Sequence, residues 1–366
     1  MDRKLLGLSL AISAVLASTN IASASERWTN NETIKFWGGQ KYENIDITTA
    51  QDENEKNGGG IHNTGTIYYL QNNTYTGNKA HYGGGLYNSG IIHNIEKEVY
   101  ANNSALGDGG AIYNNETIKN ISATFKGNKA ADFGGAIYNF GDYDSDENQN
   151  ETKVSAIIEA INGTFENNTA YSGGAIGNEG KIGSINGSFI GNTAETAYGG
   201  AIFNSKNDNV AGTDWNYGEI SSIGGTFTKN SAKLGGGAIY NDGTIKEIKD
   251  ATFDQNTTEA NGGALYNNKT IEALSNTTFT KNTASGNGGA IYNEGIIAST
   301  GKNTFSENSA TQGGAVYNKG KFNISRYASF NNNSATQGGA IYNDKDATVT
   351  SSELSNQTFK GNSAKN

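Results

Sequence analysis

The chain has 366 residues, including 50 Gly but no Pro and no Cys, and its formal net charge is −9. The absence of Cys excludes disulfides and thiolate chemistry, and the acidic balance disfavours nucleic acid and anionic membrane surfaces as partners. Gly and Asn suit tight turns, and a chain without Pro can place every residue in a strand ladder. We therefore expect an ordered chain that is mostly strand and turn.

Residues 1–24 have the pattern of a signal peptide. Arg3 and Lys4 precede an apolar stretch from Leu5 to Ala17, which is too short to span a bilayer. Ala22-Ser23-Ala24 then provides an A-x-A cleavage site. No later segment is long and apolar enough for a transmembrane helix, so we predict an exported mature chain without one.

Residues 25–57 precede the repeats described below and do not carry their motifs. They contain Trp28, Trp37 and an acidic run from Asp52 to Glu55. We interpret this segment as an N-terminal cap that covers open sheet edges.

An internal repeat dominates residues 58–366. The motif Gly-Gly-(Ala/Gly)-aliphatic-x-Asn occurs eleven times, at intervals of 25 or 26 residues apart from two intervals of 39 and 37 residues. The copies begin at Gly58, Gly83, Gly109, Gly134, Gly173, Gly199, Gly236, Gly262, Gly288, Gly313 and Gly338. The two long intervals predict insertions near 142–155 and 205–217.

A second motif, aromatic-x-x-Asn, alternates with the first, and aliphatic residues three apart, such as Ile118 and Ile121, lie between them. Repeated Gly, Asn, Thr and Ser oppose helix, whereas strands of three to five residues fit each segment. Three such strands per repeat make one turn of a solenoid. The sequence therefore predicts an all-β fold, a right-handed single-stranded parallel β-helix of about eleven coils.

The first motif also predicts which side chains point inward. Its aliphatic residue never becomes polar, so we expect it to face the core. Side chains of a strand alternate with a period of two, so the Asn two residues after the aliphatic residue should face inward too. Identical Asn side chains in successive coils can satisfy one another as a hydrogen-bonded ladder. The predicted ladder residues include Asn114, Asn139, Asn241, Asn293 and Asn343.

The position between the aliphatic residue and the Asn should face outward, and it is usually Tyr. This column includes Tyr113, Tyr138, Tyr240, Tyr266, Tyr292, Tyr317 and Tyr342. Such a stripe could stack on sugars or dock a protein, but the favoured interpretation is that the tyrosines stack on one another and stabilise the sheet. Trp215 in the second insertion is a further candidate contact residue if that loop protrudes.

The first insertion carries alternating carboxylates, Asp142, Asp144 and Asp146, which suit a calcium loop. The positions at which an EF-hand loop needs Gly and a final Glu hold Glu147 and Lys153, so a solvated acidic loop is the favoured interpretation. No other metal site, catalytic residue or cofactor is predicted.

The paired motifs resemble the passenger repeats of the chlamydial polymorphic membrane proteins and related bacterial autotransporter adhesins. Strings such as Phe125-Lys126-Gly127-Asn128 followed by Gly134-Gly135-Ala136-Ile137-Tyr138-Asn139 carry the resemblance. It implies a β-helical passenger, export, a role in adhesion or host contact, and a C-terminal transmembrane barrel. The last motif starts at Phe359, with no alternating ten-residue strands after it, which leaves a shortened passenger, a secreted variant and a split gene as interpretations.

We therefore expect an exported, non-catalytic, monomeric rod at the bacterial cell surface, at the outer membrane or outside the cell. Its expected partner is a host cell-surface protein or glycan. The alternative is a polysaccharide lyase or glycoside hydrolase on the same scaffold. Such enzymes need clustered carboxylates, whereas the acidic residues of this sequence are scattered among variable positions.

Overall fold

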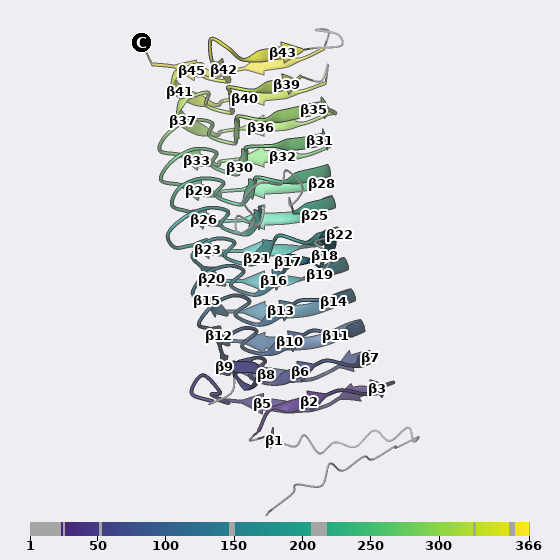
Figure 1. Ribbon diagram of the computed structural model, residues 1–366. Coiled ribbons are helices and arrows are strands. Elements are labelled where there is room, and N and C mark those ends of the chain that lie inside the picture. Colours follow the sequence, from purple (N-terminus) through teal and green to yellow (C-terminus); the bar gives the residue numbers. More distant parts are fainter. Residues whose placement is uncertain are drawn as a thin grey trace, which may run out of the picture.

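The computed structural model describes residues 23–24, 26–50, 53–145, 151–205, 218–324, 327–350 and 356–365. Strands from successive repeats pair in parallel and form three sheets that run the length of a rod (Figure 1). The predicted all-β parallel β-helix is confirmed. Within the described residues the only helical element is the short 3-10 helix η1 (Glu53–Lys56). No described helix is long and apolar enough to cross a membrane.

Sheet I has 12 strands and contains the aliphatic-x-Asn part of every Gly-Gly motif. Its strands are β2 (Trp28–Asn30), β6 (Ile61–Asn63), β10 (Leu86–Asn88), β13 (Ile112–Asn114), β16 (Ile137–Asn139), β21 (Ile176–Asn178), β24 (Ile202–Asn204), β27 (Ile239–Asn241), β30 (Leu265–Asn267), β34 (Ile291–Asn293), β38 (Val316–Asn318) and β42 (Ile341–Asn343).

Sheet II has 20 strands and carries the paired aliphatic residues and the core aromatic residue. Its strands are β1 (Ser23–Ala24), β3 (Thr33–Ile34), β4 (Trp37–Gly38), β5 (Lys41–Glu43), β7 (Thr66–Gln71), β8 (Thr74–Thr76), β11 (Ile91–Ala101), β14 (Thr117–Lys126), β19 (Ile157–Glu166), β22 (Lys181–Ile190), β25 (Glu219–Thr228), β28 (Thr244–Asp254), β31 (Thr270–Ser275), β32 (Thr278–Thr280), β35 (Ile296–Thr300), β36 (Thr304–Ser306), β39 (Lys321–Asn323), β40 (Ser329–Asn331), β43 (Thr348–Thr350) and β44 (Thr358–Lys360).

Sheet III has 11 short strands that follow the aromatic-x-x-Asn motif. They are β9 (Lys79–Ala80), β12 (Ser104–Ala105), β15 (Lys129–Ala130), β20 (Thr169–Ala170), β23 (Thr193–Ala194), β26 (Ser231–Ala232), β29 (Thr257–Thr258), β33 (Thr283–Ala284), β37 (Ser309–Gln312), β41 (Ser334–Gln337) and β45 (Ser363–Ala364). A separate antiparallel hairpin consists of β17 (Gly141–Ser145) and β18 (Glu151–Ser155).

Each coil passes through sheets I, II and III in turn, and equivalent motif residues pair directly between coils. Ile112 pairs with Ile137, and Phe125 pairs with Phe165. This register places equivalent residues of successive repeats directly above one another. Each position of the repeat therefore forms a column of side chains along the rod.

The segment that precedes the repeats forms one further coil. Strand β2 pairs with β6, β3 and β4 pair with β7, and β5 pairs with β8. Trp28 takes the place of the aliphatic residue, Asn30 that of the ladder Asn, and Tyr42 that of the core aromatic residue. The motif was not recognisable here because Trp28 lacks the Gly-Gly pair before it.

The two glycines of each motif make the turn from sheet III into sheet I. The first has φ between 62° and 73° in all eleven copies, which favours a residue without Cβ. The second lies against the next coil: a Cβ at Gly110 would be 2.2 Å from the carbonyl oxygen of Gly135. The Gly-Gly pair is thus required by backbone conformation at one position and by coil spacing at the other.

Between the sheets lies a core of stacked columns. The aromatic column runs from Tyr42 through Phe330, and its residues are fully buried. Neighbouring rings lie nearly parallel with centroids 4.4–5.1 Å apart, the spacing of the coils themselves. Isoleucine and leucine columns from sheets I and II fill the remaining volume.

Two hydrogen-bonded Asn ladders hold the turns. In the first ladder each Nδ2 donates to the Oδ1 of the next coil at 2.7–3.3 Å, from Asn30 to Asn343. All five residues predicted for this ladder lie in it. In the second ladder, from Asn78 to Asn362, both the backbone N–H and Nδ2 donate to the next Oδ1 at 2.9–3.0 Å. The repeat therefore satisfies its buried amides between coils.

Candidate functional site

The outer face of sheet I carries the tyrosine column that was predicted as a binding surface. Because the residues before and after this position point into the core, its side chains point away from the core. Outward direction does not bring exposure, however: Tyr138 is 3% exposed and Tyr113 is 6% exposed, and Tyr292 and Tyr317 are also buried. Tyr240, Tyr266 and Tyr342 are partly buried.

The tyrosines are covered partly by one another. Tyr87 and Tyr113 stack with centroids 5.0 Å apart, and Tyr292 stacks on Tyr317 at the same distance. A second set of rings lies just before the Gly-Gly turn and packs on the column from the side. Tyr82 contacts Tyr113, and Tyr198 contacts Tyr240. The outer face of sheet I is thus a second, thin aromatic layer.

A glycine in the column makes room for one of these lateral rings. Gly177 stands where most coils have Tyr, and a Cβ there would lie 3.1 Å from the Cβ of Phe133. The Phe133 ring stacks on Phe203, with centroids 5.5 Å apart, and on Tyr138. Gly177 therefore does not leave a gap in the aromatic layer, because Phe133 fills it.

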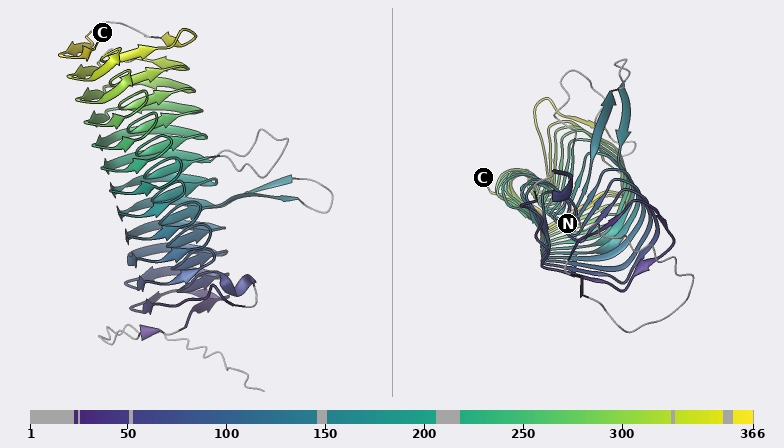
Figure 2. Two further views of the ribbon diagram at one scale, coloured as in Figure 1. Left: turned by 90° about the vertical axis from the view of Figure 1, so that its left-hand side faces the viewer. Right: turned by 60° about the horizontal axis from the view of Figure 1, so that its bottom comes forward.

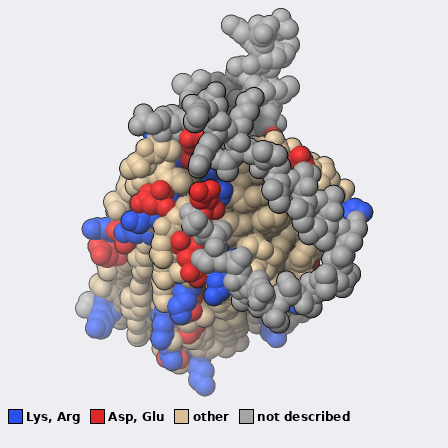
Figure 3. All heavy atoms as spheres, turned by 90° about the horizontal axis from the view of Figure 1, so that it is seen from below, with Lys and Arg blue, Asp and Glu red and all other residues tan. Residues whose placement is uncertain are grey.

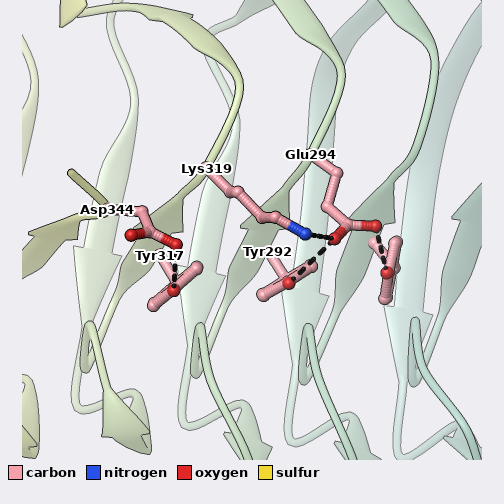
Figure 4. A network of polar contacts seen from close by, with 6 residues as sticks. Tyr292, Glu294, Tyr317, Lys319 and Asp344 are labelled. Carbon is pink, nitrogen blue, oxygen red and sulfur yellow. Dashed lines mark hydrogen bonds and ion pairs between the residues drawn. The ribbon is translucent and has the colours of Figure 1, made fainter. Parts of the chain in front are cut away.

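Toward the C-terminal end, carboxylates of the following turns accept hydrogen bonds from the tyrosine hydroxyls (Figure 4). Tyr266 donates to Glu294 Oε2 at 2.6 Å, and Tyr292 donates to Glu294 Oε1 at 3.2 Å. Lys319 Nζ lies 2.6 Å from Glu294 Oε1, and Tyr317 donates to Asp344 at 3.0 Å. These contacts join neighbouring coils on the outside of the rod.

The electrostatics of this network fit a structural role. Burial alone would raise the pKa of Glu294, but hydrogen bonds from Lys319 and Tyr266 hold it below its usual value. Burial, followed by the hydrogen bond to Asp344, raises the pKa of Tyr317 to about 12. The hydroxyls therefore stay protonated and donate to anionic carboxylates, which gives strong hydrogen bonds.

Burial favours mutual stacking for the covered members of the column. Mutual stacking accounts for the observed packing, and the buried members offer little ring surface to a ligand. A binding role for Tyr113, Tyr138, Tyr292 and Tyr317 would have to act through ring edges alone.

An open groove of about 350 Å³ runs along sheet III over four successive coils. Thr193, Ser231, Thr257 and Thr283 supply a row of hydroxyls along it. Glu195, Lys233 and Glu259 add charges of both signs. The groove contains no aromatic side chain, so it lacks the stacking surface typical of sugar sites.

Among the described residues, the first insertion departs most from the rod surface. Strands β17 and β18 form a hairpin that projects sideways from the coils (Figure 2). Asp142 and Asp144, two of the weak calcium candidates, lie in β17. Asp146 and Trp215 lie outside the described residues. Among the described residues, no group of three or more His, Cys, Asp or Glu is placed to hold a metal ion.

Charged side chains of both signs are intermixed on the surface seen from the N-terminal end (Figure 3). Ion pairs also join neighbouring coils, such as Lys126–Glu166 at 3.2 Å and Lys246–Glu219 at 2.6 Å. The net negative charge is therefore not gathered into a single patch on that face.

Glu98, a buried carboxyl group in the second motif-bearing coil, was not singled out from the sequence. It is 1% exposed, and no other Asp, Glu, Lys, Arg or His among the described residues is buried to this degree. The sequence did show that the interior of these two coils is unusual. Only the first two motifs read Gly-Gly-Gly, and only their coils have Tyr as the core aromatic residue of the repeat.

Comparison with known proteins identifies the repeat. Six segments match the Chlamydia polymorphic membrane protein repeat: residues 122–139, 224–242, 250–268, 276–294, 304–319 and 328–344. Each matched segment covers the part of sheet II that carries the core aromatic residue, then a residue of the second Asn ladder, a strand of sheet III and the following strand of sheet I. No curated protein and no solved structure matches significantly.

Proposed function

We propose that this chain, which carries repeats of the Chlamydia polymorphic membrane protein type, is an exported, surface-exposed passenger rod. In this proposal it binds a host cell-surface protein or glycan and catalyses no reaction. The repeat match supports the passenger role. The regular columns support a scaffold, because a rod whose coils are nearly identical offers few places for a specialised cleft.

The single observation that carries the proposal further is the placement of the insertions. Both insertion points lie at the turn between sheet I and sheet II, where Phe140 and Ala156 flank the first insertion and Ser205 and Gly218 flank the second. The hairpin β17–β18 extends away from the coils on that side (Figure 2). Protruding loops on a rigid scaffold are where binding residues concentrate, so we assign the ligand contact to these insertions rather than to the tyrosine column.

The register shows that each insertion can be removed without changing the coil. In the uninterrupted coil, Asn178-Glu179-Gly180 leads into Lys181 and Ile182, which pair with Ile157 and Ile158 below and with Glu219 and Ile220 above. Deleting residues 141–155, or residues 206–217, therefore restores a turn of the same length. The first deletion also needs Ala156→Gly, because a Cβ at the equivalent Gly180 would lie 2.4 Å from a backbone oxygen.

The test compares the full chain with these two deletion variants for binding to host cells, matrix proteins and a glycan panel. We expect at least one deletion to weaken binding about tenfold or more, while circular dichroism and melting temperature stay nearly unchanged. A matched control replaces residues 141–155 with a Gly/Ser linker of equal length. It shows whether binding depends on the side chains of the hairpin or only on the presence of an inserted segment.

Two outcomes would count against the proposal. If the intact chain binds no cell, matrix protein or glycan, the adhesive role is lost. If it releases new reducing ends or unsaturated sugars from a polysaccharide panel, the alternative of a polysaccharide lyase or glycoside hydrolase replaces it.

A further inference from the structure

The interior of the coils that contain β6–β8 and β10–β11 differs from the interior of the later coils at three positions. The core aromatic residues are Tyr75 and Tyr100, whereas the repeats from Phe125 onward have Phe. The corner of sheet II that precedes them holds Asn73 and Glu98, where the next coil has Ala123 and two later coils have the uncharged polar residues Thr277 and Asn303. In the first coils the polar groups face one another inside the rod.

The third position lies in the turn that leads into sheet I, and it shows that several residues together shape this interior. Gly60 and Gly85 replace the Ala that follows Gly-Gly in the later coils. A Cβ at Gly60 would lie 2.6 Å from Cδ1 of Tyr75, and one at Gly85 would lie 2.8 Å from Cδ1 of Tyr100. The missing methyl groups leave the space that these tyrosine rings occupy.

Glu98 occupies this interior without a cation. Its Oε1 accepts hydrogen bonds from the backbone N–H of Asn73 at 2.8 Å and from Nδ2 of Asn73 at 3.0 Å. Its Oε2 and the hydroxyl oxygens of Tyr75 and Tyr100 are buried and have no hydrogen-bond partner. The titratable groups that interact with it are Tyr42 on β5, Tyr75 on β8 and Tyr100 on β11, and none of them carries a positive charge.

We propose that Glu98, Tyr75 and Tyr100 form a proton-binding site that closes the first coils when Glu98 is protonated and loosens them when it ionises. A neutral carboxyl group can donate its proton to a tyrosine oxygen and still accept from Asn73. A carboxylate would be buried with two hydrogen bonds and no counter-charge, which is costly in a dry interior. This proposal does not depend on the proposed function.

The sign of the pH dependence follows from the direction of the pKa. Burial raises the pKa of Glu98 from 4.5 to about 8, and the hydrogen bonds from Asn73 and the nearness of Tyr75 offset only part of this. Between these two values the folded coil keeps the proton that the open coil releases. The closed state is therefore fully favoured below the lower value and loses stability as pH rises through the window, by up to about tenfold per pH unit.

Hydrogen exchange followed by mass spectrometry on the full chain tests this site. After correction for intrinsic exchange rates, we expect peptides from residues 61–105 to open about 50-fold more often at pH 8 than at pH 6. Peptides from residues 239–305, where no described carboxyl group is buried, are the internal reference. Glu98→Gln keeps the shape and the hydrogen bonds to Asn73, and it should abolish the difference.

A control variant and a second measurement separate Glu98 from a neighbouring carboxyl group that could titrate in the same range. Burial also raises the pKa of Asp108 to about 7, so Asp108→Asn must leave most of the effect in place. Infrared difference spectra between wild type and Glu98→Gln should show a protonated carboxyl band at pH 6 that disappears by pH 9. The proposal is overturned if the Gln variant keeps the full pH dependence, or if that band is absent at pH 6.

Discussion

The first coils and the coils from Ile239 to Phe330 share one backbone architecture but place their polar groups differently. In the first coils Glu98 and the hydroxyls of Tyr75 and Tyr100 lie inside the rod, without a cation and partly without hydrogen bonds. In the later coils the core column is Phe, and tyrosines bond Glu294 and Asp344 on the outer face. The Asn ladders thus fix the coil in both regions, while the positions between them are free to carry other chemistry.

The two regions should also respond oppositely to pH. The pKa of Glu98 is raised, so its contribution to stability is lost as pH rises. The pKa of Glu294 is lowered, so its contribution is present above the ordinary pKa and is lost as pH falls through the folded value. Alkali should therefore loosen the first coils and acid the outer network of the later ones.

The largest expected effect tests what the two regions share. Asn103 and Asn256 belong to the second ladder and are fully buried. The side chain of each donates to the next Asn of the ladder and to the backbone carbonyl of a core aromatic residue. Either residue changed to Ala should cost about 4 kcal/mol of unfolding free energy, because several buried partners lose their bonds. Denaturant unfolding checks this, with the exposed Asn120→Ala as control. Markedly unequal losses of unfolding free energy at Asn103 and Asn256 would contradict the idea that the ladder stabilises both regions in the same way.

A smaller effect sharpens the contrast between the two cores. Gly85→Ala should cost about 2 kcal/mol, since the new methyl group meets the Tyr100 ring. Ala264→Gly in a later coil should cost about 1 kcal/mol through lost packing and added backbone freedom. A double-mutant cycle of Gly85→Ala with Tyr100→Leu should show coupling, because a smaller core residue gives the methyl group room. Additive effects would contradict the proposed fit.

The outer network gives the next effect. Tyr266→Phe removes the 2.6 Å hydrogen bond to Glu294 and should cost about 1 kcal/mol at neutral pH. The cost should shrink as pH falls and Glu294 becomes protonated, since part of the bond's strength comes from the carboxylate. Thermal unfolding at neutral and acid pH measures it. A cost that does not change with pH would show that the hydroxyl acts through packing alone.

The smallest effect concerns exposed ion pairs, which occur between coils in both regions. Lys246→Gln breaks the 2.6 Å pair with Glu219, in which both side chains are substantially exposed. We expect a change within about 0.5 kcal/mol that disappears in high salt. A larger, salt-insensitive loss would mean that charges on the surface help to set the coil register.

Local patterns predicted most of the fold. The eleven Gly-Gly motifs and the alternating aromatic-x-x-Asn motifs specify strands, turns, inward columns and the coil, because each repeats the same turn chemistry. The motif did not reveal the coil before the first repeat, because Trp28 there occupies the position that is aliphatic in all eleven motifs. A coil without its glycines is visible only through its pairing with β6.

What the tertiary structure decided was which columns are covered. The sequence indicated correctly that the tyrosine side chains leave the core, but it could not show that Tyr82, Phe133 and Tyr198 pack over them from the preceding turn. Nor could it show that Glu98 is enclosed beside Tyr75 without a cation, although the two-residue period counted back from Tyr100 turns its side chain inward. Periodicity fixes the direction of a side chain relative to its own strand, whereas its burial depends on neighbours that are distant in the chain and are brought there by the coil.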